Sequence, residues 1–152
     1  MQLAVLQKIA KGKYISGALW ICLISVFFMS PAVKAAFIVV NTSVPKTPYT
    51  LADTRAVFMM HQRFWPNGER IKVFVLADSD PLHKDFVKTN LKMYPHQLRR
   101  VWDRMSFSGT GIAPTLLYSE QEMIDKIANT PNSIGYIHNR AAHENIRFFE
   151  YQ

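Results

Sequence analysis

The residues best suited to chemistry in this sequence are neutral hydrogen-bond donors placed where they could hold an anion. Ser79 lies where an apolar run, Ile71–Leu76, meets a helix that Pro81 is well suited to begin. Ser79 or Asp80 is a natural N-cap, and a helix start leaves backbone N–H groups beside the positive end of its dipole. This geometry can receive an anion, although it is also an ordinary feature of α/β proteins.

Two glycine-containing segments offer further donors. Segment 106–111 combines two hydroxyl side chains with a flexible backbone, which could form a nest for an oxyanion across a cleft from Ser79. The expected strand 133–137 contains a glycine that allows close approach of a ligand or a neighbouring backbone. The ordinary interpretation of segment 106–111 is a solvent loop, and that of the glycine in 133–137 is close packing. Arg63 could add a charge-assisted hydrogen-bond donor. The candidate ligand-binding residues are therefore Ser79, Ser108, Gly109, Thr110, Gly111 and Tyr136.

No motif for catalysis or for metal binding stands out. The sequence has no nucleophile elbow, no phosphate-cradling P-loop and no G-x-G-x-x-G, and its carboxylates are dispersed. None of the histidines has metal-ligand spacing on a helix face, so each is interpreted as a surface or capping residue. We therefore expect no enzyme activity, no metal and no cofactor. The histidines are His61, His83, His96, His138 and His143.

The first 35 residues have the three-part pattern of a secretory signal. Three lysines precede a 15-residue apolar run, Ile15–Met29, and small residues end at Ala35, so cleavage is expected between Ala35 and Ala36. The alternative is an uncleaved membrane anchor, but the run is shorter than the roughly 20 residues that a spanning helix needs. The expected organisation is a signal peptide at 1–35 and one exported domain at 36–152.

Removal of the signal changes the bulk properties. The chain has 18 basic and 11 acidic residues, a net charge of +7, and four of the basic residues lie within the first 35, which leaves +3. The only cysteine, Cys22, also lies there, so the domain has neither a disulfide nor a thiol nucleophile. No run of basic residues with interleaved aromatics remains, and a nucleic-acid partner is therefore not expected.

Hydrophobic periodicity and capping residues predict the order β-α-β-α-α-β-α-β-β. This alternation indicates a single α/β domain with a mixed β-sheet flanked by helices. Thr50 with Asp53 resembles a capping box, and Ser119 with Glu122 forms another. The expected strands are 37–41, 71–76, 115–118, 133–137 and 145–151, and the expected helices are 51–61, 81–93, 95–105 and one that begins after 119.

A series of short pieces from Leu51 to Tyr136 resembles the small exported phosphate ABC transporter substrate-binding-like proteins. The resemblance implies one part of a type 2 periplasmic binding protein, an α/β fold that binds phosphate or another oxyanion in the periplasm and works with an inner-membrane transporter or receptor. It also implies that Ser79 and the loop Ser108-Gly109-Thr110 contact the bound anion. The matching pieces are Val57-Phe58, Trp65-Pro66-Asn67-Gly68, Ile71–Val75, Ser79-x-Pro81-Leu82, Trp102-x-Arg104-x-x-Phe107-x-Gly109-x-Gly111, Pro114 and Ile134-Gly135-Tyr136-Ile137.

An alternative function remains open because the junction is acidic and the domain is short. Asp78 and Asp80 flank Ser79, and two carboxylates are unfavourable neighbours for phosphate where the dielectric constant is low. A domain of 117 residues can supply one lobe or a truncated pair of lobes, whereas binding proteins of this class bury their ligand between two full lobes. The alternative is an interaction or sensory-accessory module that keeps the fold and docks on a membrane receptor or an envelope assembly.

Overall fold

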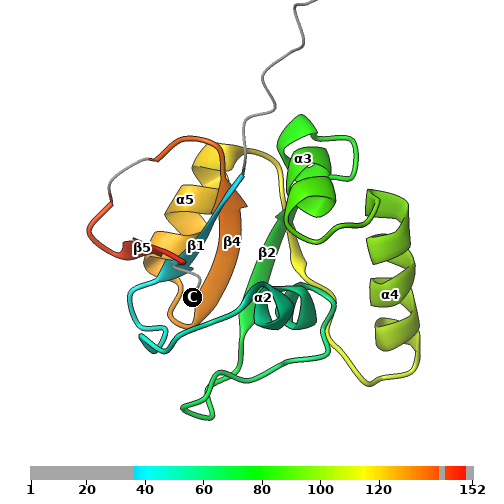
Figure 1. Ribbon diagram of the computed structural model, residues 1–152, viewed down its shortest axis with the longest axis horizontal. Coiled ribbons are helices and arrows are strands. Elements are labelled where there is room, and N and C mark those ends of the chain that lie inside the picture. The colour runs from blue at the N-terminus through cyan, green and yellow to red at the C-terminus, as the bar shows by residue number, and fades with distance from the viewer. Residues whose placement is uncertain (1–35, 141–142, 150–152) are drawn as a thin grey trace, which may run out of the picture. The chain divides into compact units, whose positions relative to one another are not determined.

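The computed structural model describes residues 36–140 and 143–149. The predicted signal peptide and its cleavage site lie outside the described residues. A five-stranded sheet with the strand order β3-β2-β4-β1-β5 forms the centre of the domain (Figure 1). β2 runs parallel to β3 and β4, whereas β1 is antiparallel to β4 and β5, so the predicted mixed sheet is confirmed. The strands are β1 (Phe37–Asn41), β2 (Lys72–Leu76), β3 (Thr115–Leu117), β4 (Ser133–Ile137) and β5 (Ile146–Phe148).

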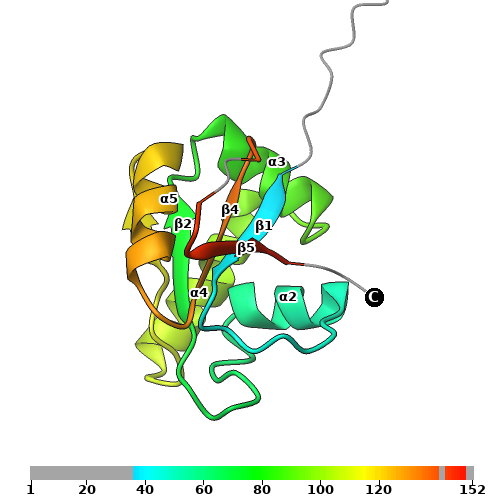
Figure 2. The same cartoon turned by 90° about the vertical axis from the view of Figure 1, so that its left-hand side faces the viewer.

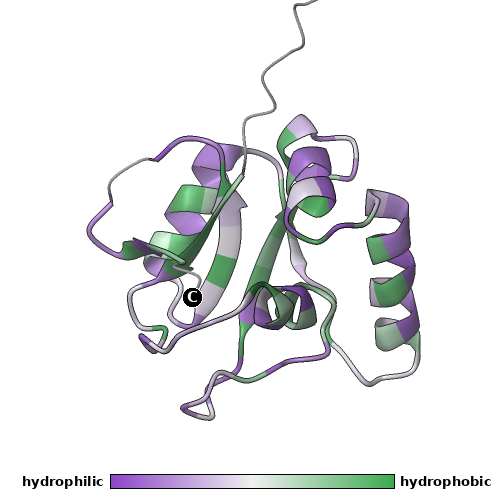
Figure 3. Ribbon diagram, viewed as in Figure 1, coloured by the Kyte–Doolittle hydropathy of each residue, from purple (hydrophilic) through white to green (hydrophobic). Residues whose placement is uncertain are grey.

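Within residues 36–140 and 143–149, four helices complete the predicted order of elements and cover both faces of the sheet. α5 packs on one face, and the other three lie on the opposite face (Figure 2). The hydrophobic positions of α4 gather on the side toward the domain, while its outer side is hydrophilic (Figure 3). The predicted α/β architecture is therefore confirmed. The helices are α2 (Leu51–Phe58), α3 (Pro81–Thr89), α4 (Pro95–Phe107) and α5 (Glu120–Asn129).

Local capping explains where the helices begin. The hydroxyl of Thr50 accepts from the N–H of Asp53 at 3.2 Å, and the Asp53 carboxylate accepts from the N–H of Thr50 at 2.7 Å, as the capping-box pattern predicts. The Ser119 hydroxyl accepts from the N–H of Glu122 at 3.1 Å. α2 ends at Phe58, three residues before its predicted end, and Met60 just beyond adopts a left-handed φ of 60° that cannot continue a helix.

An aromatic cluster joins the three helices on one face to the sheet. The rings of Phe86 and Tyr136 stack with centroids 4.0 Å apart, and Phe58 meets Phe86 edge-to-face at 4.7 Å. The indole Nε1 of Trp102 donates to the carbonyl oxygen of Phe58 at 2.7 Å. α2, α3 and α4 are therefore held as one layer, which fixes the junction between β2 and α3.

Gly135 is explained by packing on the other face of the sheet. A Cβ atom at this position would lie 2.5 Å from Sδ of Met123 and 2.8 Å from Cδ1 of Ile127. Both residues belong to α5, which needs this close approach to the strand. The packing interpretation is therefore the correct one. Within residues 36–140 and 143–149, no helix is long and apolar enough to cross a membrane.

Candidate functional site

The junction between β2 and α3 lies at the carboxyl end of the parallel strands, where α/β proteins commonly bind ligands. Asp80 rather than Ser79 is the N-cap, and its carboxylate accepts from the N–H groups of Leu82 at 2.8 Å and His83 at 3.3 Å. The N–H groups expected to point outward are thus already used by the chain. Ser79 is exposed, and neither its hydroxyl nor its N–H is hydrogen-bonded to any described residue.

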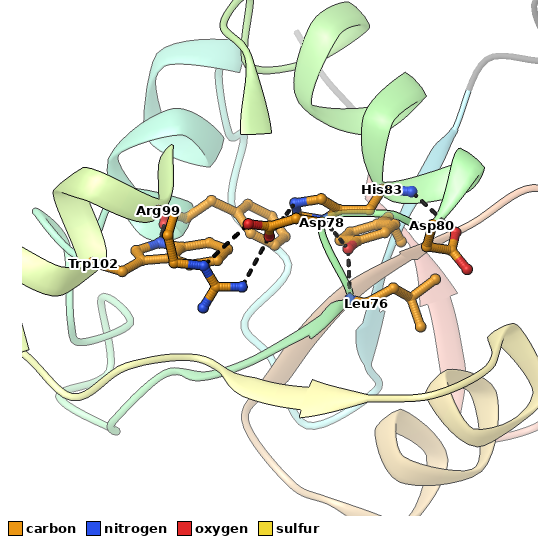
Figure 4. Close-up of polar contacts among 8 residues, drawn as sticks. Leu76, Asp78, Asp80, His83, Arg99 and Trp102 are labelled. Atoms are coloured by element: carbon orange, nitrogen blue, oxygen red, sulfur yellow. Dashed lines mark hydrogen bonds and ion pairs between the residues drawn. The ribbon is translucent and has the colours of Figure 1, made fainter. Parts of the chain in front are cut away.

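Asp78 is paired with an arginine that comes from α4. Nη2 of Arg99 lies 2.8 Å from Oδ1 of Asp78, and Nε lies 3.2 Å from Oδ2, so the guanidinium binds the carboxylate through two nitrogens (Figure 4). The Arg99 guanidinium also lies over the Trp102 ring, 5.1 Å from its centroid. Hydrogen bonding to Asp78 holds the pKa of Arg99 above its ordinary value. The acidity expected at this junction is therefore partly neutralised.

His83 lies behind Asp78 in the core, so its interpretation as a surface or capping histidine is wrong. The side chain has no exposed surface, and its Nδ1 lies 2.6 Å from the hydroxyl oxygen of Tyr136. That oxygen accepts from the N–H of Leu76 at 2.8 Å, so its own proton is directed to Nδ1 of His83. The ring proton then sits on Nε2, which faces Oδ1 of Asp78 at 3.6 Å.

The buried groups of this chain of contacts are held neutral. Burial lowers the pKa of His83, and the nearby Arg99 adds to this effect, whereas Asp78 and Asp80 oppose it. Burial also raises the pKa of Tyr136. A neutral imidazole and a neutral phenol therefore connect the sheet to the charged pair of Asp78 and Arg99.

This burial predicts a pH-dependent stability. Between pH 6.5, the ordinary pKa of histidine, and the lowered pKa of folded His83, the unfolded chain binds a proton that the folded chain excludes. The free energy of unfolding should therefore fall as the pH drops below 6.5, by up to about 1.4 kcal/mol per pH unit. Denaturant unfolding should be measured between pH 7.5 and 5, a range of about 2.5 units around that pKa. The free energy of unfolding should fall less steeply with decreasing pH in His83→Asn than in the native chain. Equal slopes in the native chain and the variant would contradict the assignment.

Tyr136 lies entirely within the core. Its ring stacks on Phe86, and its hydroxyl is shared between Leu76 and His83. The structure therefore gives this residue a packing and positioning role beneath the junction, and it presents no surface to solvent.

The predicted oxyanion nest is the C-terminal cap of α4. The N–H groups of Thr110 and Gly111 both donate to the carbonyl oxygen of Met105 at 3.0 Å. The N–H of Gly109, at φ 69°, donates to the carbonyl oxygen of Ser106 at 3.1 Å. The Ser108 hydroxyl bonds to Thr110 and to Met105. The donors expected to face an anion are therefore used by the helix, whose C-terminal end is the negative end of its dipole.

The two predicted donor groups do not face one another across a cleft. Ser79 follows the carboxyl end of β2, whereas segment 108–111 precedes the amino end of β3, and these strands are parallel. The two groups therefore lie at opposite ends of the sheet (Figure 1). Segment 108–111 instead meets Arg63, whose guanidinium Nη1 donates to the carbonyl oxygen of Thr110.

A pocket of about 560 Å³ opens between α3 and the start of α4, beside the junction. Lys84 and Lys88 line it from one face of α3, and neither forms an ion pair within the described residues. Sequence reasoning missed these two lysines, although their spacing of four residues on a helix is a signal for a shared face. The pocket is lined by Asp78, Lys84, Asp85, Lys88, Tyr94, Pro95 and His96. The described residues contain no group of three His, Cys, Asp or Glu placed to hold a metal ion.

No protein-family model matches the sequence, and no curated protein matches it. Among solved structures, the chain is similar to an ABC-type phosphate transport receptor from Vibrio cholerae, with 14% identity and a TM-score of 0.59 over 77% of this chain and 46% of that chain. It is also similar to PstS from Borrelia burgdorferi, with 17% identity and a TM-score of 0.53 over 68% of this chain and 40% of that chain. The chain thus spans less than half the length of each. It has the α/β fold of these periplasmic-binding-protein-like neighbours.

Proposed function

We propose that the chain is an exported, non-catalytic solute-binding-like protein that binds phosphate or a similar oxyanion in the periplasm. The observation that carries this proposal is the pocket between α3 and α4, where Lys84 and Lys88 face one remaining carboxylate, Asp85, because Asp78 is already compensated by Arg99. The net positive charge of this concave lining attracts an anion more strongly than the same charge would on a flat surface.

The start of α4 adds to this attraction. Pro95 and His96, its first two residues, line the same pocket, so the positive end of the helix dipole is directed at the bound group. Ser79 follows the lining residue Asp78 in the chain, and its exposed hydroxyl is a further candidate donor. Phosphate would thus be held by ammonium groups, with hydroxyl and backbone donors at its rim.

The exposure of the two lysines supports weak binding. One of the two similar solved structures is named as a phosphate transport receptor. A pocket open to solvent leaves one side of an oxyanion in water, and the desolvation that strengthens charge interactions is then incomplete. We expect a dissociation constant in the millimolar range, with an inner-membrane transporter as the protein partner.

Isothermal titration of the purified full chain tests this proposal. Phosphate, sulfate and acetate should each be titrated at low salt, because the attraction of exposed lysines is screened by salt. The Lys84→Gln, Lys88→Gln double variant should bind phosphate at least about tenfold more weakly. Lys72→Gln removes an exposed cation at the start of β2 and should leave the affinity unchanged. Unaltered binding by the double variant, or no binding at millimolar phosphate, would refute the proposal, and Ser79→Ala tests the rim contact separately.

A docking module is a second candidate, because one observation favours it. Phe107 and Ile112, at the end of α4 and in the loop that follows, are 92% and 72% exposed. Large apolar side chains left in water on a small domain commonly mark a protein-binding surface. This surface lies at the amino ends of β2 and β3, away from the lysine pocket, so the chain can bind a solute and dock on a partner.

A further inference from the structure

A second, smaller pocket lies at the amino end of the parallel strands. Its floor is apolar and is formed by the end of α2, the start of β2 and the loop after α4. Two arginines and one glutamine form its polar rim. We name this the arginine pocket, and it is lined by Val57, Met60, Gln62, Arg63, Arg70, Ile71, Val73 and Ile112.

The two arginines of this pocket are held in place but are not neutralised. Arg63 donates to the carbonyl oxygen of Thr110, and the Arg70 guanidinium lies 5.6 Å from the centroid of the Phe64 ring. Neither forms an ion pair with a carboxylate anywhere in the described part of the chain. Two oriented guanidinium groups without a counter-charge fit a carboxylate, which guanidinium binds through paired hydrogen bonds.

The size of the arginine pocket limits what can enter it. It encloses about 40 Å³, room for one or two water molecules and therefore for a single carboxylate group rather than a whole solute. The occupant must consequently be the end of a side chain or of a polypeptide whose remainder lies on the surface outside.

That surrounding surface is apolar and borders an open sheet edge. Ile112 is 72% exposed beside the pocket, and Leu116 of β3 is 41% exposed. Leu116 pairs with Val75 of β2, so it shares the sheet face of Val73, which lies in the pocket floor. β3 is the edge strand at this side of the sheet, and its outer backbone groups are available to pair with an added strand.

We propose that the arginine pocket and the edge of β3 together dock an extended segment of a partner protein in which an acidic side chain and apolar side chains stand two residues apart, so that they share one face of the segment. A glutamate or aspartate of the segment enters between Arg63 and Arg70, and the apolar side chains cover Ile112 and Leu116. The charge of the pocket selects an acidic partner, and the two-residue period of a strand places residues i, i+2 and i+4 of the segment on this one face. The inference rests on the docking role and is independent of oxyanion binding.

Synthetic peptides of roughly eight residues, the length of a long strand segment, test the chemistry of the partner. One labelled peptide carries leucine and glutamate in turn at every second position, with serine at the positions between them. A second has lysine in place of each glutamate, and a third has serine in place of each leucine. In fluorescence anisotropy with the full chain, the leucine–glutamate peptide should bind at least about tenfold more tightly than either of the others. Equal binding of the lysine peptide would overturn the acidic preference, and no binding of the first peptide would overturn the proposal.

Variants locate the binding surface. The Arg63→Ser, Arg70→Ser double variant should weaken the leucine–glutamate peptide about tenfold or more, and Arg63→Lys with Arg70→Lys should restore part of the affinity. Lys126→Ser removes a cation from α5, on the opposite face of the sheet, and should have no effect. A thermal melt that matches the native chain shows that the serine variant is folded.

The lysine-pocket variant separates this inference from the proposed solute binding. Lys84→Gln with Lys88→Gln should leave peptide binding unchanged while it weakens phosphate binding. If the lysine variant rather than the arginine variant loses the peptide, the proposed docking surface is wrong although a docking role survives. If the purified chain is a dimer that the peptide cannot compete with, a second copy occupies the face and the proposal of an acidic partner fails.

Discussion

Replacing Trp102 by alanine should lower the free energy of unfolding by about 3–5 kcal/mol. The Trp102 side chain is 1% exposed, and its indole Nε1 donates to the carbonyl oxygen of Phe58, so it joins α4 to α2. Its removal leaves a cavity in this layer and an unpaired carbonyl at the end of α2. It also removes the ring against which the Arg99 guanidinium lies, so the Asp78 pair loses its support. Chemical denaturation followed by circular dichroism measures the loss.

Two controls make this result interpretable. Trp102→Phe keeps most of the apolar volume and should lose less than the alanine variant, because it removes the N–H donor but leaves a smaller cavity. Tyr118→Ala truncates an aromatic side chain that is 83% exposed and should change stability by less than about 0.5 kcal/mol. A loss below about 1 kcal/mol for Trp102→Ala would contradict the packing of α4 on α2.

Tyr136→Phe should cost about 2–4 kcal/mol, although it removes a single oxygen atom. That oxygen accepts from the N–H of Leu76 and donates to Nδ1 of His83, and both groups are buried. Each buried polar group left without a partner costs about 1–3 kcal/mol. Denaturant unfolding at pH 7.5, about one unit above the ordinary pKa of histidine, measures this loss of unfolding free energy while His83 is neutral.

The matched control for this change is Tyr118→Phe, which removes the same oxygen from an exposed ring and should leave stability within about 0.5 kcal/mol. The phenyl ring of the Tyr136→Phe variant would still stack on Phe86, so the loss in this buried variant is attributable to hydrogen bonding and not to packing. A Tyr136→Phe variant as stable as the native chain would show that Leu76 and His83 find other partners.

Local features of this fold could be predicted from the sequence because they depend on neighbouring residues. The capping boxes at Thr50 and Ser119 and the proline at the start of α3 act within one helical turn, so their patterns survive in any tertiary context. The order of strands and helices follows from hydrophobic periodicity in the same way. His83 could also have been recognised as buried, because it precedes Phe86 and Val87 by three and four residues on the apolar face of α3.

The candidate site could not be predicted in the same way because its contacts are distant in sequence. Asp78 and Arg99 are 21 residues apart, and only the packing of α4 beside α3 brings them together. The residue types of segment 108–111 predict an anion nest and a helix C-cap equally well, because both need glycine and hydroxyl residues. Which role they take depends on whether a helix carbonyl needs their N–H groups, and here Met105 uses two of them.

Observation of individual amides during a phosphate titration tests the central claim most directly. In ¹H–¹⁵N spectra of the full chain, phosphate should shift the amide signals of Lys84, Lys88 and His96 along one saturating curve, because these residues line the pocket between α3 and α4. The signals of Gly109 and Gly111, whose N–H groups are held by helix carbonyls at the other end of the sheet, should stay in place. Shifts confined to Gly109 and Gly111, or no saturating shift at the three pocket residues, would contradict oxyanion binding between α3 and α4.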